Sequence, residues 1–153
     1  RPTVRVCGGE NQIVIKKNKM ATRSIIAKLD DKGVQAIYCH NDGYLSNNGK
    51  ILDQHYQNEV KVDNLIAQGD ASSLKDTIED TIFYMRDRGE ENKHAEQFND
   101  ENVLLKYAFE QCDAEVVYMF AYGSWYVYDN SDKIGNSSYQ FIELEEALYN
   151  VLA

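Results

Sequence analysis

The apolar positions of this chain follow the two-residue period of strands in some stretches and the helical period in others. Residues 22–29 and 34–40 each hold several apolar residues, and the polar sequence Asp30-Asp31-Lys32-Gly33 separates them. A glycine readily adopts the positive φ that such a turn requires. This pattern therefore predicts a β-hairpin near the beginning of the folded part of the chain.

Helical spacing follows this hairpin. Residues 45–56 are predicted to form a short helix with Ser46 as its N-cap. Residues 59–68 are predicted to form a second helix, which Asn58 caps and Gly69 ends.

The rest of the chain predicts more strands and two more helices. Residues 81–86 read as a strand, and a helix is expected after residue 99. Residues 115–128 read as a hairpin whose turn is Gly123-Ser124, a pair suited to a type II′ turn. A short strand is expected over 139–142, followed by an amphipathic helix up to residue 152.

Hairpins and amphipathic helices together predict an α+β fold. We expect one antiparallel sheet of about four to six strands, with four helices packed mainly on one face. No Gly-x-Gly-x-x-Gly or Walker sequence is present, so neither a dinucleotide nor a nucleoside triphosphate site is predicted. The sequence predicts no cofactor.

The 153 residues suit a single domain, but the first nineteen differ from the rest. Residues 1–19 hold five basic residues and one acidic residue, and Met20 has the character of a translation start. We therefore interpret 1–19 as an extension that is foreign to the fold, and 20–153 as a single α+β domain.

The chain is acidic, with a formal charge of −9 at neutral pH. From residue 20 onward there are 11 basic and 24 acidic residues, a net charge of −13. Phosphate backbones are bound through lysine and arginine, so we expect no direct binding of nucleic acid. The acidic surface could face a basic protein, but an ordinary solvated surface is the favoured interpretation.

The sequence also predicts where the protein works. No apolar run approaches the roughly 20 residues that span a bilayer, so no membrane association is expected. No secretory leader is recognisable, so the sequence does not support secretion. Cys7, Cys39 and Cys112 are odd in number and far apart, which argues against a disulfide framework and fits a reducing compartment. We therefore predict a cytoplasmic protein.

The densest group of reactive side chains is the heptapeptide Tyr-Cys-His-Asn-Asp-Gly-Tyr at positions 38–44. Side chains of a strand alternate between its faces, so His40 points away from Cys39, and a shared metal site is not predicted. A Cys39 nucleophile activated by His55 is also considered, but a cysteine on an apolar strand is usually a small buried hydrophobe.

The remaining polar groups are the candidate ligand-binding residues. A turn residue such as Asp42 is equally suited to capping the next helix and to touching a ligand. The Arg86 and Arg88 pair offers planar donors for a phosphate or carboxylate, although salt bridges within their own loop are slightly favoured. The candidate ligand-binding set is Tyr38, His40, Asp42, Tyr44, His55, Arg86 and Arg88.

Five segments of the chain are distinctive in combination. They are Met20-Ala21-Thr22-Arg23-Ser24, Tyr38-Cys39-His40-Asn41-Asp42-Gly43-Tyr44, Asn48-Gly49-Lys50, Gly69-Asp70-Ala71-Ser72-Ser73-Leu74 and Arg86-Asp87-Arg88-Gly89-Glu90. These segments resemble a family of small proteins that phages, prophages and other mobile elements encode. The resemblance implies a phage-related origin and supports Met20 as the natural start, and it implies no mechanism.

Two functions follow from these patterns. The favoured one is a non-enzymatic accessory protein in the host cytosol, which binds a host protein or a small anionic ligand. The alternative is a small enzyme in which His40 and Asp42 perform acid–base chemistry while Arg86 and Arg88 hold an anionic substrate. No complete set of nucleophile, base and orienting group can be identified, which favours the first. The tyrosine-rich segment 118–128 leaves a homodimer open.

Overall fold

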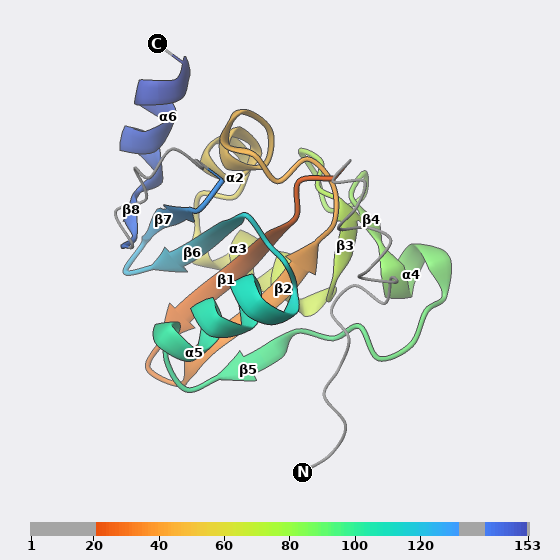
Figure 1. Ribbon diagram of the computed structural model, residues 1–153. Helices are drawn as coiled ribbons and strands as arrows, with labels where there is room; N and C mark the ends of the chain where they lie inside the picture. Colours follow the sequence, from red (N-terminus) through yellow and green to blue (C-terminus); the bar gives the residue numbers. More distant parts are fainter. Residues whose placement is uncertain (1–20, 132–139, 153) are drawn as a thin grey trace.

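The computed structural model of the chain describes residues 21–131 and 140–152 (Figure 1). The extension expected over 1–19 and the start expected at Met20 lie outside these described residues. Within the described ranges, no helix has both the length and the apolar character that crossing a membrane requires.

The described residues contain one sheet of eight strands in the order β4-β3-β2-β1-β6-β7-β8, with β5 paired to β2 beside this path. The strands are β1 (Ser24–Asp30), β2 (Gly33–Cys39), β3 (Ala71–Ser73), β4 (Ile82–Phe83), β5 (Glu96–Phe98), β6 (Val116–Ala121), β7 (Ser124–Asp129) and β8 (Ile142–Glu143).

The sheet is mixed, which corrects the expectation of an antiparallel sheet with four to six strands. β1 and β6 pair in parallel, with Ile26 opposite Tyr118, and β2 and β3 pair in parallel at Cys39 and Ala71. Each of these parallel pairs is connected by a segment that contains helices and returns the chain to the same end of the sheet. The broader prediction of an α+β fold is confirmed.

The central strands are buried on both faces. Ile26, Val116 and Tyr118 pack into one apolar core, whereas Ile25 and Val117 pack into a second core on the opposite face. A strand covered on both sides is expected to be a continuous apolar run, as β6 is.

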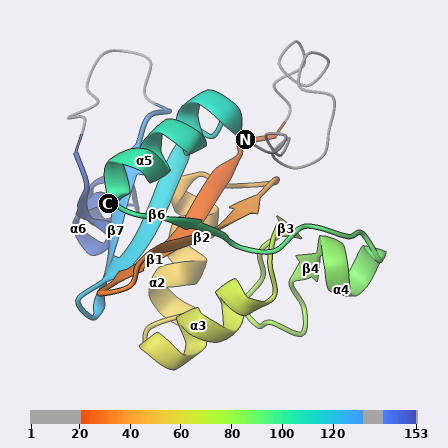
Figure 2. The same ribbon diagram turned by 90° about the horizontal axis from the view of Figure 1, so that it is seen from below.

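Helices cover both faces of this sheet, as Figure 2 shows for α5 on one side and α2 and α3 on the other. The sequence predicts helices mainly on one face. Three of them, α2, α3 and α6, pack into the core on one face, and α5 packs into the core on the other face. The helical segments are the π-helical turns η2 (Leu45–Gly49) and η3 (Tyr107–Gln111), and the α-helices α2 (Lys50–His55), α3 (Glu59–Ala67), α4 (Tyr84–Arg88), α5 (Glu101–Lys106) and α6 (Leu144–Leu152).

The predicted helix ends agree with the structure in one case and differ in another. Asn58 caps α3, because its side chain accepts a hydrogen bond from the Lys61 amide at 2.9 Å. Ser46 is not an N-cap: η2 begins after Tyr44, which makes no side-chain capping bond.

Two further predictions are corrected. The strand expected over 81–86 is only the two residues of β4, since the Asp87 carboxylate accepts a hydrogen bond from the Phe83 amide at 2.8 Å and the chain turns into α4. The β6–β7 turn is centred on Tyr122 and Gly123, whose φ angles are 54° and 79°. Two positive φ values define a type I′ turn instead of the predicted type II′ turn.

The chain makes a tight turn immediately after β2. The Gly43 amide donates to the Thr22 carbonyl at 2.8 Å, and the Tyr118 hydroxyl donates to the Gly43 carbonyl at 2.6 Å. A Cβ atom at Gly43 would lie 2.6 Å from the Ser24 Cβ, so only glycine fits this crossing. These contacts fix where the residues after β2 lie.

Candidate functional site

The polar residues after β2 meet those of β3 because the two strands are parallel and their carboxyl ends lie side by side. The amide of His40 donates to the Ala71 carbonyl at 3.1 Å, and the amide of Asn41 donates to the Ser72 carbonyl at 2.9 Å. The Asn41 side chain also donates to the Ser72 hydroxyl at 3.4 Å. We call the group formed by His40, Asn41, Ser72, Arg88 and Lys93 the strand-end cluster.

The imidazole of His40 is held by a buried phenol. The hydroxyl of Tyr38, a residue that is 1% exposed, lies 2.7 Å from His40 Nδ1. The backbone of Tyr38 is fixed in turn, because its amide donates to the carboxylate of the buried Asp70 at 2.9 Å. The ring of His40 therefore has a defined position at the edge of the fold, where it is partly exposed.

Two cations lie over the ring of Tyr84, the first residue of α4. The Arg88 guanidinium lies 5.3 Å from the centre of the Tyr84 ring, and the Lys93 ammonium lies 6.0 Å from the same centre. Arg88 also donates to the Ser72 hydroxyl at 3.2 Å. Within the described residues, neither Arg88 nor Lys93 forms an ion pair with a carboxylate. Arg88 and Lys93 are therefore two cations at this end of the sheet that have no ion-pair partner among the described residues.

The two arginines that the sequence grouped together have different environments. Arg86 donates to the Ile78, Glu79 and Thr81 carbonyls at 3.0, 3.2 and 2.8 Å. It also pairs with the Asp87 carboxylate at 3.0 Å, and this hydrogen bond is the main reason why the pKa of Asp87 is lowered. Arg86 holds its own loop, as the salt-bridge interpretation expected, while Arg88 belongs to the strand-end cluster.

The other three candidates lie apart from that cluster or make no contact with it. His55 Nε2 is 3.6 Å from the Asp76 carboxylate, at a separate hollow beside α2. Asp42 has a φ of 55°, and its carbonyl, not its carboxylate, receives the Asn48 amide at 3.3 Å. Tyr44 is 43% exposed at the start of η2.

The structure brings Tyr38, His40 and Arg88 into one neighbourhood and adds residues that the sequence did not indicate. Asn41, Ser72 and Lys93 were missed as contributors to the strand-end cluster. The turn after Gly69 in the sequence could have drawn attention to Ser72, but only the parallel pairing of β2 with β3 shows that it faces Asn41.

Both cysteines that the structure describes, Cys39 and Cys112, are buried. Cys39 is fully buried and contacts the Asn48 side chain at 3.4 Å, and burial raises its thiol pKa to about 11. This agrees with its interpretation as a buried hydrophobe and leaves no reactive thiolate at neutral pH. Cys112 is buried and disulfide-bonded, which corrects the expectation that the cysteines form no disulfide and removes their support for a reducing compartment.

Over residues 21–131 and 140–152, no three or more His, Cys, Asp or Glu side chains are placed to hold a metal ion. Comparison of the chain with protein-family models, with curated proteins and with solved structures gives no match. The interpretation of the site therefore depends on its own geometry.

Proposed function

We propose that this is a non-enzymatic accessory protein that binds a small anionic ligand at the strand-end cluster. The observation that carries this proposal is the placement of Arg88 and Lys93 around the Tyr84 ring with no carboxylate paired to either within the described residues. In a chain of formal charge −9, such a cationic spot is the favourable place for a phosphate or carboxylate group.

Neighbouring donors complete the proposed site. The Ser72 hydroxyl accepts hydrogen bonds from Asn41 and Arg88, so its own hydrogen is left to donate to a ligand oxygen. Arg88 is exposed and anchored by only one hydrogen bond, which allows its remaining N–H groups to turn toward an anion. His40 lies at the same strand ends, one residue from Asn41.

The biological setting of this proposal rests on resemblance. Similarity of segments between Met20 and Glu90 to mobile-element proteins supports a phage-related origin and a place in the host cytosol. We propose that a host protein is a second class of partner, and that a homodimer is compatible with the tyrosine-rich β6–β7 hairpin.

The second candidate is a small enzyme with His40 as its acid–base group. The short contact between the Tyr38 hydroxyl and His40 Nδ1 favours it, because an oriented imidazole is what proton transfer requires. The Asp42 carboxylate makes no hydrogen bond or ion pair with a described residue, and Arg86 is committed to its own loop. The binding interpretation needs neither of these groups.

The test is a titration with inorganic phosphate in which binding is measured by calorimetry and by NMR. Arg88→Gln and Lys93→Gln should each weaken phosphate binding by about tenfold, since a hydrogen bond to a charged group contributes about 1.5–3 kcal/mol. The matched control is Lys106→Gln, which removes an equal charge from the exposed surface of α5. Equal phosphate affinities for all three variants would contradict the proposal.

The same titration separates the two candidates through His40→Gln. If His40 only contributes to binding, the variant loses phosphate affinity and neither protein hydrolyses a phosphate monoester. Hydrolysis by the wild-type protein that is lost in His40→Gln, at unchanged phosphate affinity, would instead support the enzyme.

A further inference from the structure

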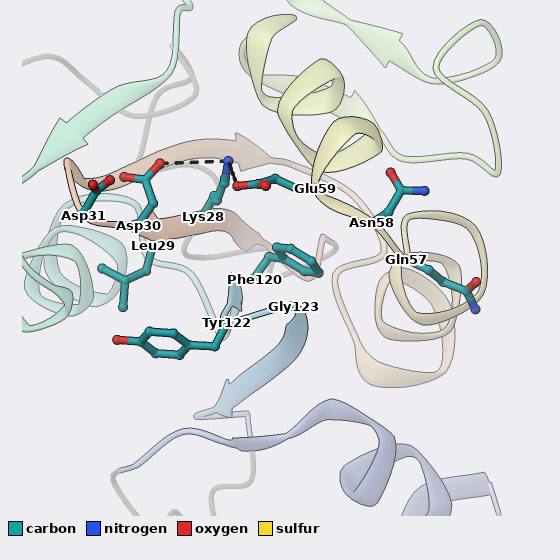
Figure 3. A pocket seen from close by; sticks show the side chains of 10 residues that line it. All are labelled: Lys28, Leu29, Asp30, Asp31, Gln57, Asn58, Glu59, Phe120, Tyr122 and Gly123. Carbon is teal, nitrogen blue, oxygen red and sulfur yellow. Dashed lines mark ion pairs between the residues drawn. The ribbon is translucent and has the colours of Figure 1, made fainter.

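A hollow of about 680 Å³ lies at the opposite end of β2 from the strand-end cluster. Three connections surround it: the end of β1 with the turn into β2, the link from α2 to α3, and the β6–β7 turn (Figure 3). A second hollow of about 230 Å³ shares Gln57, Phe120 and Gly123 with the first. We call these two adjoining hollows the acidic groove.

The groove carries more negative charge than its own cation can neutralise. Among the described residues that line the groove, Lys28 is the only cation. It is already paired with Glu59 at 2.9 Å (Figure 3) and with Asp63 at 2.5 Å. Four other lining carboxylates have no ion pair within the described residues. They are Asp31, Asp53, Glu143 and Glu145.

Two of these carboxylates, Asp53 and Glu145, are close enough for their like charges to interact. Partial burial raises the pKa of Asp53, and the negative charge of Glu145 raises it further. A positive group placed between them would remove this repulsion.

The floor and rim of the groove are aromatic. Phe120 and Trp125 are 4% and 6% exposed and form part of the lining, so the groove offers apolar surface beneath its carboxylates. Tyr122, at the rim, is 89% exposed and gains almost nothing from packing. Its ring is available to a cation, which binds favourably over an aromatic face.

These features identify the chemistry of the occupant. A divalent metal is disfavoured, because no three acidic, histidine or cysteine side chains converge among the described residues. A lysine or arginine side chain suits the groove better, since its aliphatic stem can lie on the apolar floor while its charged end meets separated carboxylates.

We propose that the acidic groove binds a basic segment of a partner protein, with one lysine or arginine side chain against Tyr122 and another between Asp53 and Glu145. This site is distinct from the strand-end cluster and does not depend on it. The sequence suggested only that an acidic surface could face a basic protein, and the structure gives that surface a position and a shape.

Fluorescence anisotropy with a labelled, amidated peptide of alternating arginine and glycine tests the proposal. The wild-type protein should bind this peptide in a salt-dependent manner and should not bind the matching glutamate–glycine peptide. Tyr122→Asn and Glu145→Gln should each weaken binding by about threefold, and the double variant by about tenfold.

The controls distinguish binding of the peptide in the acidic groove from nonspecific attraction to the negative charge of the protein. Glu146→Gln removes the same charge from the adjacent position of α6 without changing the lining of the groove, and it should leave the peptide affinity unchanged. Asparagine is favoured at the positive φ of position 122, so Tyr122→Asn should fold normally, as its melting temperature will show. An equal loss of affinity in Glu145→Gln and Glu146→Gln overturns the proposal, as does a wild-type protein that fails to bind the peptide.

Discussion

Cys39 and His40 are adjacent in sequence but lie in different environments, and strand alternation is the reason. The side chain of Cys39 enters the apolar core beside Ile37, whereas His40 follows the last residue of β2 and remains partly exposed. This separation could be predicted from the sequence. The hydrogen bond between Tyr38 and His40 also follows from alternation, because residues two apart on a strand share a face.

The environment of Cys39 predicts that its thiol is unreactive in the native protein. With a pKa of about 11, the thiol is protonated at pH 8, and its full burial also excludes an alkylating reagent. Iodoacetamide at pH 8 should therefore leave Cys39 unmodified in the folded protein and modify it completely in guanidinium chloride. Mass spectrometry of the peptide that contains Cys39 measures the extent of alkylation in the folded and in the denatured protein. Rapid modification of the folded protein would show that the thiol is accessible.

At the scale of elements, the segment from β4 to α4 shows why two neighbouring arginines cannot be assigned by sequence alone. Arg86 and Arg88 are separated by one residue, and on a strand they would share a face. Because the segment is helical, they point in different directions: one binds the preceding loop and the other crosses to Ser72. The strand predicted over 81–86 therefore grouped two side chains that the helix separates.

Arg86 is expected to be a stabilising residue. Arg86→Gln removes a guanidinium that binds three carbonyl groups of the 78–81 turn and pairs with Asp87, so the melting temperature at pH 7 should fall by several degrees. The pKa of Asp87 is lowered in the folded state, and its contribution is therefore present above its ordinary value of 3.8 and lost as the pH falls below it. The difference in melting temperature should accordingly shrink in acid.

The control for this prediction is Arg88→Gln, which removes an arginine with a single side-chain hydrogen bond. It should lower phosphate affinity while changing the melting temperature little. The reverse result, an unstable Arg88→Gln and a stable Arg86→Gln, would show that the two roles have been assigned to the wrong residues.

Local elements could be predicted where the determining residues are close in sequence. The β1–β2 hairpin and the Asn58 cap of α3 depend on contacts within a few positions, and both are present. The parallel pairing of β1 with β6 joins residues about ninety positions apart, as Ser24 opposite Val116 shows, and no local pattern indicates it. The same holds for Ser72, which reaches the strand-end cluster through the pairing of β2 with β3, and for Lys93, whose carbonyl accepts a hydrogen bond from the distant Asp70 amide.

At the scale of the whole molecule, charge is separated along the sheet. The strand-end cluster lies beyond the carboxyl end of β2, and the acidic groove lies at the turn that precedes β2. The net charge of −9 is a sum over the whole chain, so it indicates neither the cations of the strand-end cluster nor the carboxylates of the acidic groove. This separation would keep the proposed anion site and the proposed site for a basic segment from neutralising each other.

A binding site that concentrates like charges should reduce the stability of the free protein, and Asp53 allows this to be tested. Its pKa is raised in the folded state, so the fold binds the Asp53 proton more tightly than the unfolded chain does. The resulting destabilisation is absent below the ordinary pKa of 3.8 and develops as the pH rises through the raised folded value. Asp53→Asn should therefore increase the melting temperature at pH 7 by a few degrees, with little difference near pH 3.

The same substitution should weaken binding of the arginine–glycine peptide, because Asp53 is one of the carboxylates that the proposed segment meets. Glu146→Gln provides the comparison, since it lowers the net negative charge equally at a position outside the groove. A gain in stability coupled to a loss of peptide affinity in Asp53→Asn, and to neither in Glu146→Gln, would mean that the charges of the groove are retained for binding and not for folding. A destabilised Asp53→Asn would instead show that this carboxylate supports the fold, and the repulsion from Glu145 would then be of secondary importance.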